Sequence, residues 1–272
     1  MGKTVKGAEG FELFYREMYG ARWPDLKNAL LVEPERIPFS EGLLKPYFLD
    51  FGSYLAARAL EADPGEMLLD MCAAPGGKSL VLAAALGGRG SLTSNDRSAA
   101  RRKRLITVLD GHLPPEKRRT VRVTGYDAAR WCLYERDAYD RILLDVPCSS
   151  ERHLLHSPKH LAQWSPARTR HLAQQAYAML VSALGVLKPG GILVYSTCTI
   201  SARENDDVLD RIFAKYPAAA EAAPPPVNEG TATPYGRLIL PDSDGGLGPM
   251  YIARLRKLPR EDGSCGQGKA ES

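Results

Sequence analysis

The chain of 272 residues has the composition of an ordinary globular protein, with 44% hydrophobic residues, 25% charged residues and a formal net charge of +4. Its longest apolar runs fall short of the roughly 18 residues that a membrane span requires, which excludes a membrane protein. The five cysteines are odd in number and include no C-x-x-C pair, so we expect neither a disulfide framework nor a metal site. The start of the chain resembles neither a secretory nor a transit peptide, and we expect a cytoplasmic protein with reduced thiols.

Positive charge is concentrated in two stretches. Residues 97 to 122 include nine Lys or Arg but only two acidic residues. The second stretch contains Arg254, Arg256, Lys257 and Arg260. Each stretch is either a solvated helix face or a surface that binds the phosphate backbone of a nucleic acid. The second interpretation gains weight only if the catalytic residues also indicate a nucleic-acid substrate.

The N-terminal 45 residues predict a helical extension. Apolar residues at spacings of three and four favour helices over 8–20 and 22–32, and two prolines break the segment that follows. The stretch over 46–66, PYFLDFGSYLAARALEADPGE, predicts a helix that Pro64 and Gly65 end.

Strands and helices then alternate. Short apolar runs predict strands over 66–71, 90–96, 120–128, 139–147 and 190–198. Helices are predicted between strands over 77–88, 97–111 and 165–187, and after the last of these strands over 204–216. This order predicts a doubly wound α/β fold with a mostly parallel sheet covered on both faces. Two final strands over 236–242 and 248–256 lack a helix between them, which indicates a closing antiparallel strand. We expect one domain over 46–260, a loop over 218–234 and a disordered tail over 261–272.

A tight turn follows the first strand of this domain, in LLDMCAAPGGKS. Its Pro75, Gly76 and Gly77 allow backbone amides to approach a ligand closely, but neither a P-loop nor the G-x-G-x-x-G pattern is present. Acidic residues end four successive strands: Asp70, Asp96, Asp127 and Asp145. One such residue is more often a helix cap. Four beside a Gly-Gly turn favour a nucleoside cofactor without phosphates, such as S-adenosylmethionine, with Asp96 at the ribose and Asp127 at the adenine amine.

Cysteines end two of the strands, Cys148 in DVPC and Cys198 in YSTC. Carbon 5 of a pyrimidine is a poor nucleophile until a thiolate adds to carbon 6. A strand-end cysteine therefore suits methylation of that carbon, and Asp145 is placed to donate to ring nitrogen 3 if it carries a proton. Lys78 is placed to lower a thiol pKa or to contact the base. Position alone leaves open which cysteine attacks.

The motifs DMCAAPGGKS, SNDRS, DVPCSS and YSTCT together resemble the Fmu/NSUN family of S-adenosylmethionine-dependent RNA 5-methylcytosine methyltransferases. The resemblance extends from about residue 47 to 257. VRVTGYDAARW, DVPCSSERHLLH, GPMYIARLR and FYREMYGARWPDLKNALL look most like the member that modifies mitochondrial small-subunit ribosomal RNA. Many relatives have a glycine-rich stretch after Pro-Cys-Ser, whereas this chain has SERH, so we expect a different active-site loop.

The resemblance implies a Rossmann-like class I methyltransferase fold and assigns roles to residues. It implies that Cys198 adds to the base, that Cys148 helps to release the product, and that Asp145 and Lys78 lie near the cytosine. The implied cofactor site is Cys72, Ala73, Ala74, Pro75, Gly76, Gly77, Lys78, Asp96, Arg101, Asp127 and Asp145.

We therefore expect a monomeric enzyme that methylates carbon 5 of cytosine in RNA. The resemblance favours small-subunit ribosomal RNA, with transfer RNA as the alternative, and a partner protein could direct the enzyme to its target. A DNA cytosine methyltransferase would leave Cys198 without a role. A catalytically silent ribosome-assembly factor is a further alternative, against which the intact pair of cysteines argues.

Overall fold

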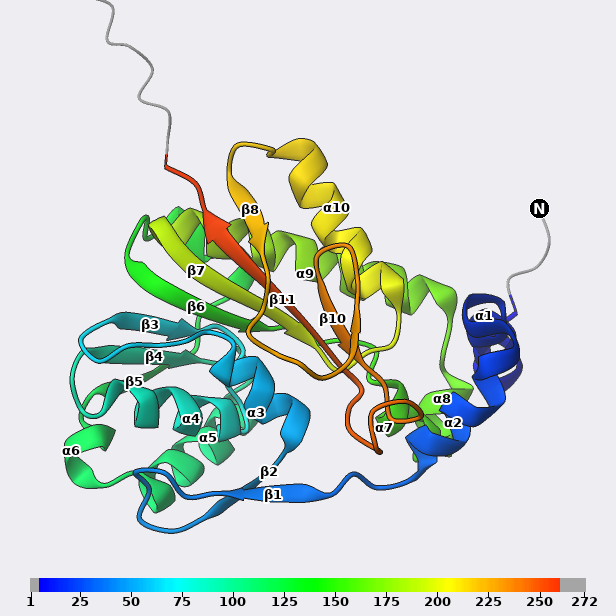
Figure 1. The fold of residues 1–272 in the computed structure, drawn as a ribbon, viewed down its shortest axis with the longest axis horizontal. Helices are drawn as coiled ribbons and strands as arrows, with labels where there is room; N and C mark the ends of the chain where they lie inside the picture. Colours follow the sequence, from blue (N-terminus) through cyan, green and yellow to red (C-terminus); the bar gives the residue numbers. More distant parts are fainter. Residues whose placement is uncertain (1–4, 260–272) are drawn as a thin grey trace, which may run out of the picture.

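The computed structural model describes residues 5–259, and its centre is a nine-stranded mixed sheet (Figure 1). The strands of this sheet are β3 (Met67–Asp70), β4 (Ser91–Asn95), β5 (Val121–Thr124), β6 (Tyr139–Asp145), β7 (Leu187–Thr197), β8 (Ala220–Ala223), β9 (Thr231–Ala232), β10 (Gly236–Ile239) and β11 (Met250–Lys257). Their order is β5-β4-β3-β6-β7-β11-β10-β9, and β8 pairs with β11. Strands β3 to β7 are parallel and β11 is antiparallel to β7. This confirms the predicted doubly wound sheet with a closing antiparallel strand.

The segment 218–234, predicted as a loop, contributes two short strands. The first half of β11 pairs with β10, and its second half, Arg254 to Lys257, pairs with β8. The longer β11 leaves half of its edge exposed beyond the four residues of β10. An exposed strand edge presents unpaired backbone groups, and β8 covers them.

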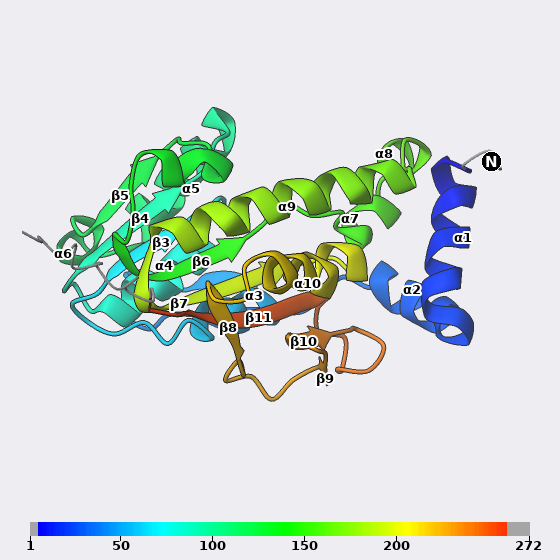
Figure 2. The same ribbon diagram turned by 90° about the horizontal axis from the view of Figure 1, so that it is seen from above.

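Consecutive residues of a strand point to opposite faces of the sheet. Because apolar residues occur on both faces, helices cover both. Leu68, Leu143 and Val194 face α3 (Phe51–Arg58), α4 (Gly77–Leu86) and α5 (Ala99–His112). The neighbouring residues Leu69 and Leu144 face α9 (Pro166–Val186), α10 (Asp206–Lys215) and the 3-10 helix η2 (Ala128–Leu133). Figure 2 shows the long α9 running along β6 and β7. A further short helix, α6 (Pro115–Arg118), precedes β5.

The N-terminal segment forms a small core of its own at one end of the molecule (Figure 2). Here α1 (Gly7–Tyr19), the 3-10 helix η1 (Gly20–Arg22) and α2 (Trp23–Leu31) lie against α7 (Glu151–Leu155) and α8 (Pro158–Ala162). Phe11, Tyr15, Trp23 and Trp164 are buried together, and their rings contact one another. The cluster also includes Ile200, from the loop after β7.

The helix predicted over 46–66 is wrong in its first part. Tyr47–Asp50 forms β2, which pairs antiparallel with β1 (Arg36–Phe39) in a separate hairpin. The side chain of Asp50 accepts a hydrogen bond from Ser53 N at 2.9 Å and so begins α3 at Phe51. The aromatic and apolar residues before this cap suit a strand as well as a helix. The hairpin pairs residues before position 45 with residues after it. The boundary between an N-terminal extension over 1–45 and a domain over 46–260 stays a prediction. The predicted tail lies outside the described residues.

Phe11 provides a test of the N-terminal core. Phe11→Ala removes a fully buried ring whose centroid lies 4.7 Å from Tyr15 and 5.6 Å from Trp164, and it should lower the free energy of unfolding by about 3–5 kcal/mol. Leu13→Ala, on the exposed face of the same helix, should change it by no more than about 0.5 kcal/mol. Urea unfolding of both variants measures the difference, and equal losses would show that α1 is not packed as described.

Candidate active site

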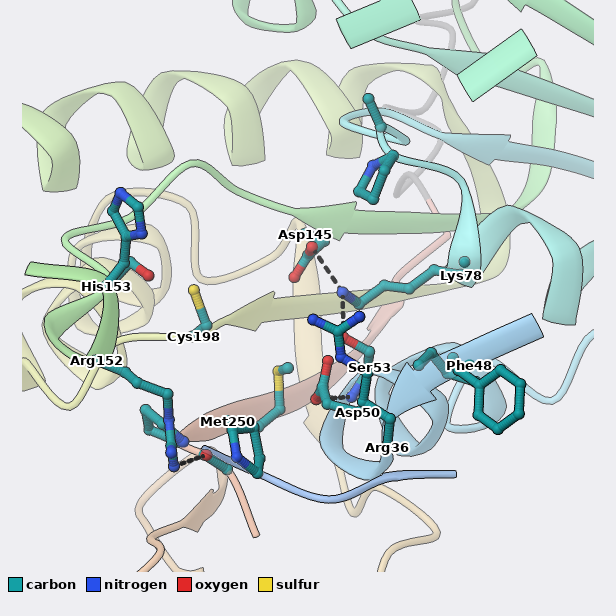
Figure 3. A pocket seen from close by; sticks show the side chains of 18 of the residues that line it. Arg36, Phe48, Asp50, Ser53, Lys78, Asp145, Arg152, His153, Cys198 and Met250 are labelled. Atoms are coloured by element: carbon teal, nitrogen blue, oxygen red, sulfur yellow. Dashed lines mark hydrogen bonds and ion pairs between the residues drawn. The ribbon is translucent and has the colours of Figure 1, made fainter. Parts of the chain in front are cut away.

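Two cavities open at the carboxyl edge of the parallel strands, where ligands bind in folds of this kind. The cysteine cavity, about 490 Å³, is lined by Cys198 of the loop after β7, by Asp145 at the end of β6 and by Lys78 at the start of α4 (Figure 3). The aspartate cavity, about 680 Å³, is lined by Asp96, Asp127 and Arg101. Cys72 lines both cavities, so the turn after β3 is the wall between them.

Lys78 and Asp145 form an ion pair inside the cysteine cavity. Lys78 Nζ lies 2.9 Å from Asp145 Oδ2 and also donates to Ser53 Oγ at 2.9 Å (Figure 3). Ser196 Oγ donates to Asp145 Oδ1 at 2.8 Å. Burial alone would lower the pKa of Lys78, but the carboxylates of Asp145 and Asp50 outweigh it and raise this pKa. Both oxygens of Asp145 are therefore acceptors, and one of the three N–H donors of Lys78 is left for a ligand.

The two strand-end cysteines meet. Their Sγ atoms lie 3.1 Å apart, and Cys198 N donates to Cys148 Sγ at 3.3 Å. Cys198 lines the cysteine cavity, whereas Cys148 lines neither cavity. The hydrogen bond between the two thiols, in which either sulfur can donate, lowers the pKa of Cys198, and Ser150 and Lys78 act in the same direction. The same contact, together with burial, raises the pKa of Cys148. The pair therefore favours a thiolate at Cys198 and a thiol at Cys148.

Carboxylates of the strand ends carry free acceptor atoms. Asp96 Oδ1 accepts from Ser98 N at 2.9 Å and Asp127 Oδ1 accepts from Ala129 N at 3.1 Å, so both residues stabilise turns as well as lining the aspartate cavity. Asp96 Oδ2 is buried without a hydrogen bond among the described residues, with Arg101 Nε 3.4 Å away. Asp70 Oδ1, in the cysteine cavity, is also buried and unbonded. Buried acceptors of this kind require donors, which the hydroxyl and ammonium groups of S-adenosylmethionine could supply.

Asp70 itself is almost completely buried and accepts a hydrogen bond from Ser79 Oγ at 2.7 Å. Burial raises the pKa of Asp70 to about 7, and the nearby Asp145 adds to the effect. Between pH values of about 4 and 7 the Asp70 carboxyl group therefore binds a proton in the folded protein and loses it in the unfolded chain. This difference makes the free energy of unfolding depend on pH.

Most of the predicted site residues lie at the two cavities. Cys72, Ala73, Ala74, Pro75, Gly77, Lys78 and Asp145 line the cysteine cavity, and Asp96, Arg101 and Asp127 line the aspartate cavity. Gly76 lines neither. Its φ of +123° turns the chain into α4, and a Cβ there would lie 3.1 Å from Leu105 and Val108. Glycine is needed at this position for the backbone path rather than for ligand contact.

Several lining residues gave no signal in the sequence. Tyr126, Pro147 and Met179 line the aspartate cavity. Arg36 and Phe48 of the β1–β2 hairpin line the cysteine cavity, together with Arg152, His153 and His156 (Figure 3). The sequence predicts the hairpin partly as a broken segment and partly as a helix, which does not place its side chains at a cavity. The two histidines follow the Cys148 motif closely, but that proximity alone does not place them at the cavity either.

The two basic stretches differ in their contacts. Arg254, Arg256 and Lys257 form ion pairs with Glu61, Glu221 and Asp137, so they connect β11 to its neighbours. Arg260 lies outside the described residues. In the first stretch Arg102 donates to the backbone oxygens of Asp96 and Arg97, while Lys103 and Arg104 are exposed. The second stretch is therefore structural, and the exposed part of the first is available to a phosphate backbone.

The described part of the chain shows neither a membrane-spanning helix nor a metal-binding cluster. None of the helices between residues 5 and 259 is both long and apolar enough to cross a membrane. In the same part of the chain, no group of three or more His, Cys, Asp or Glu is arranged to hold a metal ion.

A protein-family model described as 16S rRNA methyltransferase RsmB/F matches residues 57–256. The chain belongs to this family. Among curated proteins it is 35% identical to a mitochondrial tRNA (cytosine(34)-C(5))-methyltransferase of Danio rerio, over 83% of this chain and 65% of the relative. It is also 35% identical to the 5-cytosine rRNA methyltransferase NSUN4 of Bos taurus, over 80% of this chain and 61% of the relative. The chain thus spans slightly less than two thirds of the length of these relatives.

Solved structures show the same fold. NSun6 from Pyrococcus horikoshii with SFG superposes with a TM-score of 0.68 and 26% identity, over 82% of this chain and 55% of that one. A methyltransferase homologue from the same organism gives a TM-score of 0.72 and 24% identity, over 90% of this chain and 95% of that one. The family member described here therefore has the Rossmann-like class I methyltransferase fold, as the motifs implied.

Asp70 gives this family member a measurable pH dependence. Between the ordinary pKa of an aspartate, about 4, and its folded value of about 7, the folded state binds one more proton than the unfolded state, so this group makes stability fall as pH rises. In Asp70→Asn that contribution should disappear, and the loss of unfolding free energy between pH 5 and pH 8 should be smaller than in the wild type. Asp110→Asn, at a largely exposed carboxyl, is the control. An unchanged pH profile in Asp70→Asn would contradict the assigned burial.

Proposed function

We propose that this protein transfers a methyl group from S-adenosylmethionine to carbon 5 of a cytosine in RNA through a covalent bond to Cys198. The observation that supports this best is the thiol pair: Cys198 lines a cavity, and its Sγ lies 3.1 Å from that of Cys148, which lines neither cavity. Membership in the RsmB/F family supports the same chemistry. A retired enzyme that only binds RNA would have no need of this arrangement.

The aspartate cavity and the turn after β3 suit the cofactor. Asp96 would accept from the ribose hydroxyls, Asp127 from the adenine amine, and Asp70 from the ammonium group. Cys72 to Lys78 would approach the cofactor with backbone amides, and Arg101 supports the turn by donating to Ala74 O at 2.7 Å. When bound, S-adenosylmethionine supplies an electrophilic methyl group. The structure of NSun6 from Pyrococcus horikoshii was solved with the ligand SFG.

Lys78 and Asp145 suit recognition of cytosine. Asp145 accepts from Lys78 and Ser196, so its contacts favour an acceptor for the exocyclic amine rather than the donor role that the sequence predicted. The remaining N–H of Lys78 would donate to ring nitrogen 3 or the neighbouring carbonyl oxygen. Uracil has a donor at ring nitrogen 3 and an acceptor at position 4, so it would oppose a contact from Lys78 to ring nitrogen 3 and the contact of Asp145 with the exocyclic amine.

The thiol pair accounts for bond formation and release. The Cys198 thiolate would form a bond to carbon 6, and the displaced electron pair would make carbon 5 nucleophilic enough to bond the methyl carbon, whose bond to the sulfonium sulfur breaks and leaves its electron pair on that sulfur. The proton of carbon 5 then passes to water, the carbon 6–sulfur bond breaks, and its electron pair returns to Cys198. The Cys148 thiol, which holds its proton, stabilises the departing thiolate by hydrogen bonding.

The target is expected in small-subunit ribosomal RNA. The family description and the NSUN4 relative support ribosomal RNA, while the Danio rerio relative at the same 35% identity is named for tRNA. Motif resemblance favours ribosomal RNA, with tRNA as the second candidate. The base must leave its stack to enter the cavity, so an unpaired site is expected. We also propose a monomer, a cytoplasmic location and a targeting protein; the Danio rerio relative is named as mitochondrial, which concerns the location alone.

The two cysteines give the decisive test. Cys198→Ala should abolish both methyl transfer and any covalent RNA adduct. Cys148→Ala should still allow attack and methylation but slow release, so a protein–RNA species should persist on a denaturing gel. Transcripts of small-subunit rRNA and tRNA with labelled cofactor measure both the product and the preferred RNA.

The opposite pattern, with an adduct in Cys198→Ala and none in Cys148→Ala, would make Cys148 the nucleophile. Tight RNA binding without measurable cofactor binding by calorimetry would support the silent assembly factor instead. Labelling of DNA alone would reject RNA as the substrate.

Phe48 gives a second test, of the path that the RNA takes. This ring is 58% exposed and lines the cysteine cavity, as does Arg36 of the same hairpin, and in Figure 3 it points away from Cys198 and Asp145. A base stacked on an aromatic ring contributes about 1–3 kcal/mol, so Phe48→Ala should weaken RNA binding about 5- to 150-fold. Tyr134→Ala removes an exposed ring that lines neither cavity, and it should leave binding unchanged. Filter-binding titrations compare the two, and equal affinities would remove Phe48 from the RNA path.

A further inference from the structure

The loops that carry the two cysteines are joined by two buried carboxylates. Glu151, three residues after Cys148, accepts from Thr199 Oγ1 at 2.7 Å and from Ile200 N at 3.0 Å, both in the loop of Cys198. Glu204 lies in the 3-10 helix η3 (Ala202–Glu204) that ends the Cys198 loop. It accepts from Ser149 N at 2.8 Å and from Ser149 Oγ, in the loop of Cys148. Each loop thus provides the carboxylate that binds the other.

The N-terminal helix completes this arrangement. Tyr15 of α1 donates its hydroxyl hydrogen to Glu151 Oε1, and Tyr19 donates to Ile200 O at 2.6 Å. Both the ring of Tyr15 and the side chain of Glu151 are fully buried. Glu151 and Ile200, which are hydrogen-bonded to each other, are thus each hydrogen-bonded to helix α1 as well. This helix lies more than a hundred residues earlier in the sequence.

Burial makes these carboxylates costly. It raises the pKa of Glu204 to about 8, with a further contribution from Glu151, and it raises the pKa of Glu151 as well. None of the ion pairs among the described residues involves either group. Apolar side chains of similar size could fill the space without that cost. What they could not do is fix two irregular loops by directional hydrogen bonds.

The distance between the cysteines depends on this fixation. Each cysteine lies beyond the last residue of its strand, Asp145 in β6 and Thr197 in β7. The ladder between the two strands ends at the pair Asp145 and Ser196. Beyond it the loops are joined by a backbone bond from Val146 N to Ser196 O at 3.1 Å, by the bond from Cys198 N to Cys148 Sγ and by the carboxylate bonds. A displacement of about 1 Å would break the thiol–thiol hydrogen bond.

We propose that Glu151, Glu204 and Tyr15 are positioning residues that hold Cys148 and Cys198 within hydrogen-bond distance, so that helix α1 is a working part of the active site. The proposal rests on the proposed function only for the role of Cys198 as nucleophile. The contacts and their effect on thiol reactivity can be tested without RNA.

The first experiment compares Tyr15→Phe with Tyr235→Phe. Tyr15→Phe removes one hydroxyl and keeps the ring in its cluster, whereas Tyr235→Phe removes an exposed hydrogen bond from a tyrosine to a carboxylate, that of Asp210, elsewhere in the fold. Alkylation of Cys198 by iodoacetamide is followed across pH by mass spectrometry of its peptide. In Tyr15→Phe the rate at pH 7 should fall about five- to tenfold, because the thiolate loses its aligned donor. In Tyr235→Phe it should match the wild type.

The second experiment uses Glu204, for which a conservative variant exists. Glu204→Gln keeps an oxygen acceptor for Ser149 N, so it should retain most of the Cys198 alkylation rate. Glu204→Ala should lose it to the same extent as Tyr15→Phe. With RNA and cofactor, Tyr15→Phe should lower kcat and leave the KM for RNA unchanged.

Three results would overturn the proposal. The first is an alkylation rate in Tyr15→Phe equal to that of Tyr235→Phe. The second is a raised KM for RNA with unchanged alkylation, which would make α1 an RNA-binding element. The third is the same alkylation rate in Glu204→Gln and Glu204→Ala. Failure of the proposed function would differ, since the wild type would then not methylate RNA although the alkylation differences persisted.

Discussion

The contact between the two thiols is the constraint on which the site depends. Cys148 and Cys198 are separated by 50 positions in the chain, yet their Sγ atoms lie 3.1 Å apart. Cys198 lines the cysteine cavity, whereas Cys148 lines neither cavity. Their contact lowers the pKa of Cys198 and raises that of Cys148, so the two thiols differ in how readily they lose a proton. The proposed attack and release use this difference.

Several layers of the fold converge on that contact. The parallel pairing of β6 with β7 brings both loops to one edge of the sheet, and the same edge receives the turn after β3 and the ends of β4 and β5. This is the general place for ligands in such folds. Here it lets one wall, at Cys72, separate a cavity suited to a nucleoside from a cavity suited to a base.

Support for the site comes from outside the sheet as well as from within it. Ion pairing of Lys78 with Asp145 arises between a helix start and a strand end, while Glu151 connects α1, α7 and the loop after β7. The stretch SERH begins the short helix α7. Its glutamate accepts a hydrogen bond from the N-terminal helix beside the two cysteine loops, which a glycine could not do.

The sequence by itself determined the alternation of strands and helices, the strand-end aspartates, the Gly-Gly turn and both cysteines. These features are local: hydrophobic period, turn residues and residues at strand ends follow from neighbours in the chain. It did not determine the β1–β2 hairpin, because Tyr47 to Asp50 suits a strand or a helix and only pairing with Arg36 to Phe39 decides. Nor could it rank the cysteines, place Phe48 at the cavity or connect Tyr15 with Glu151. Those relations join residues far apart in sequence, and only the packed tertiary structure brings such groups within hydrogen-bond distance.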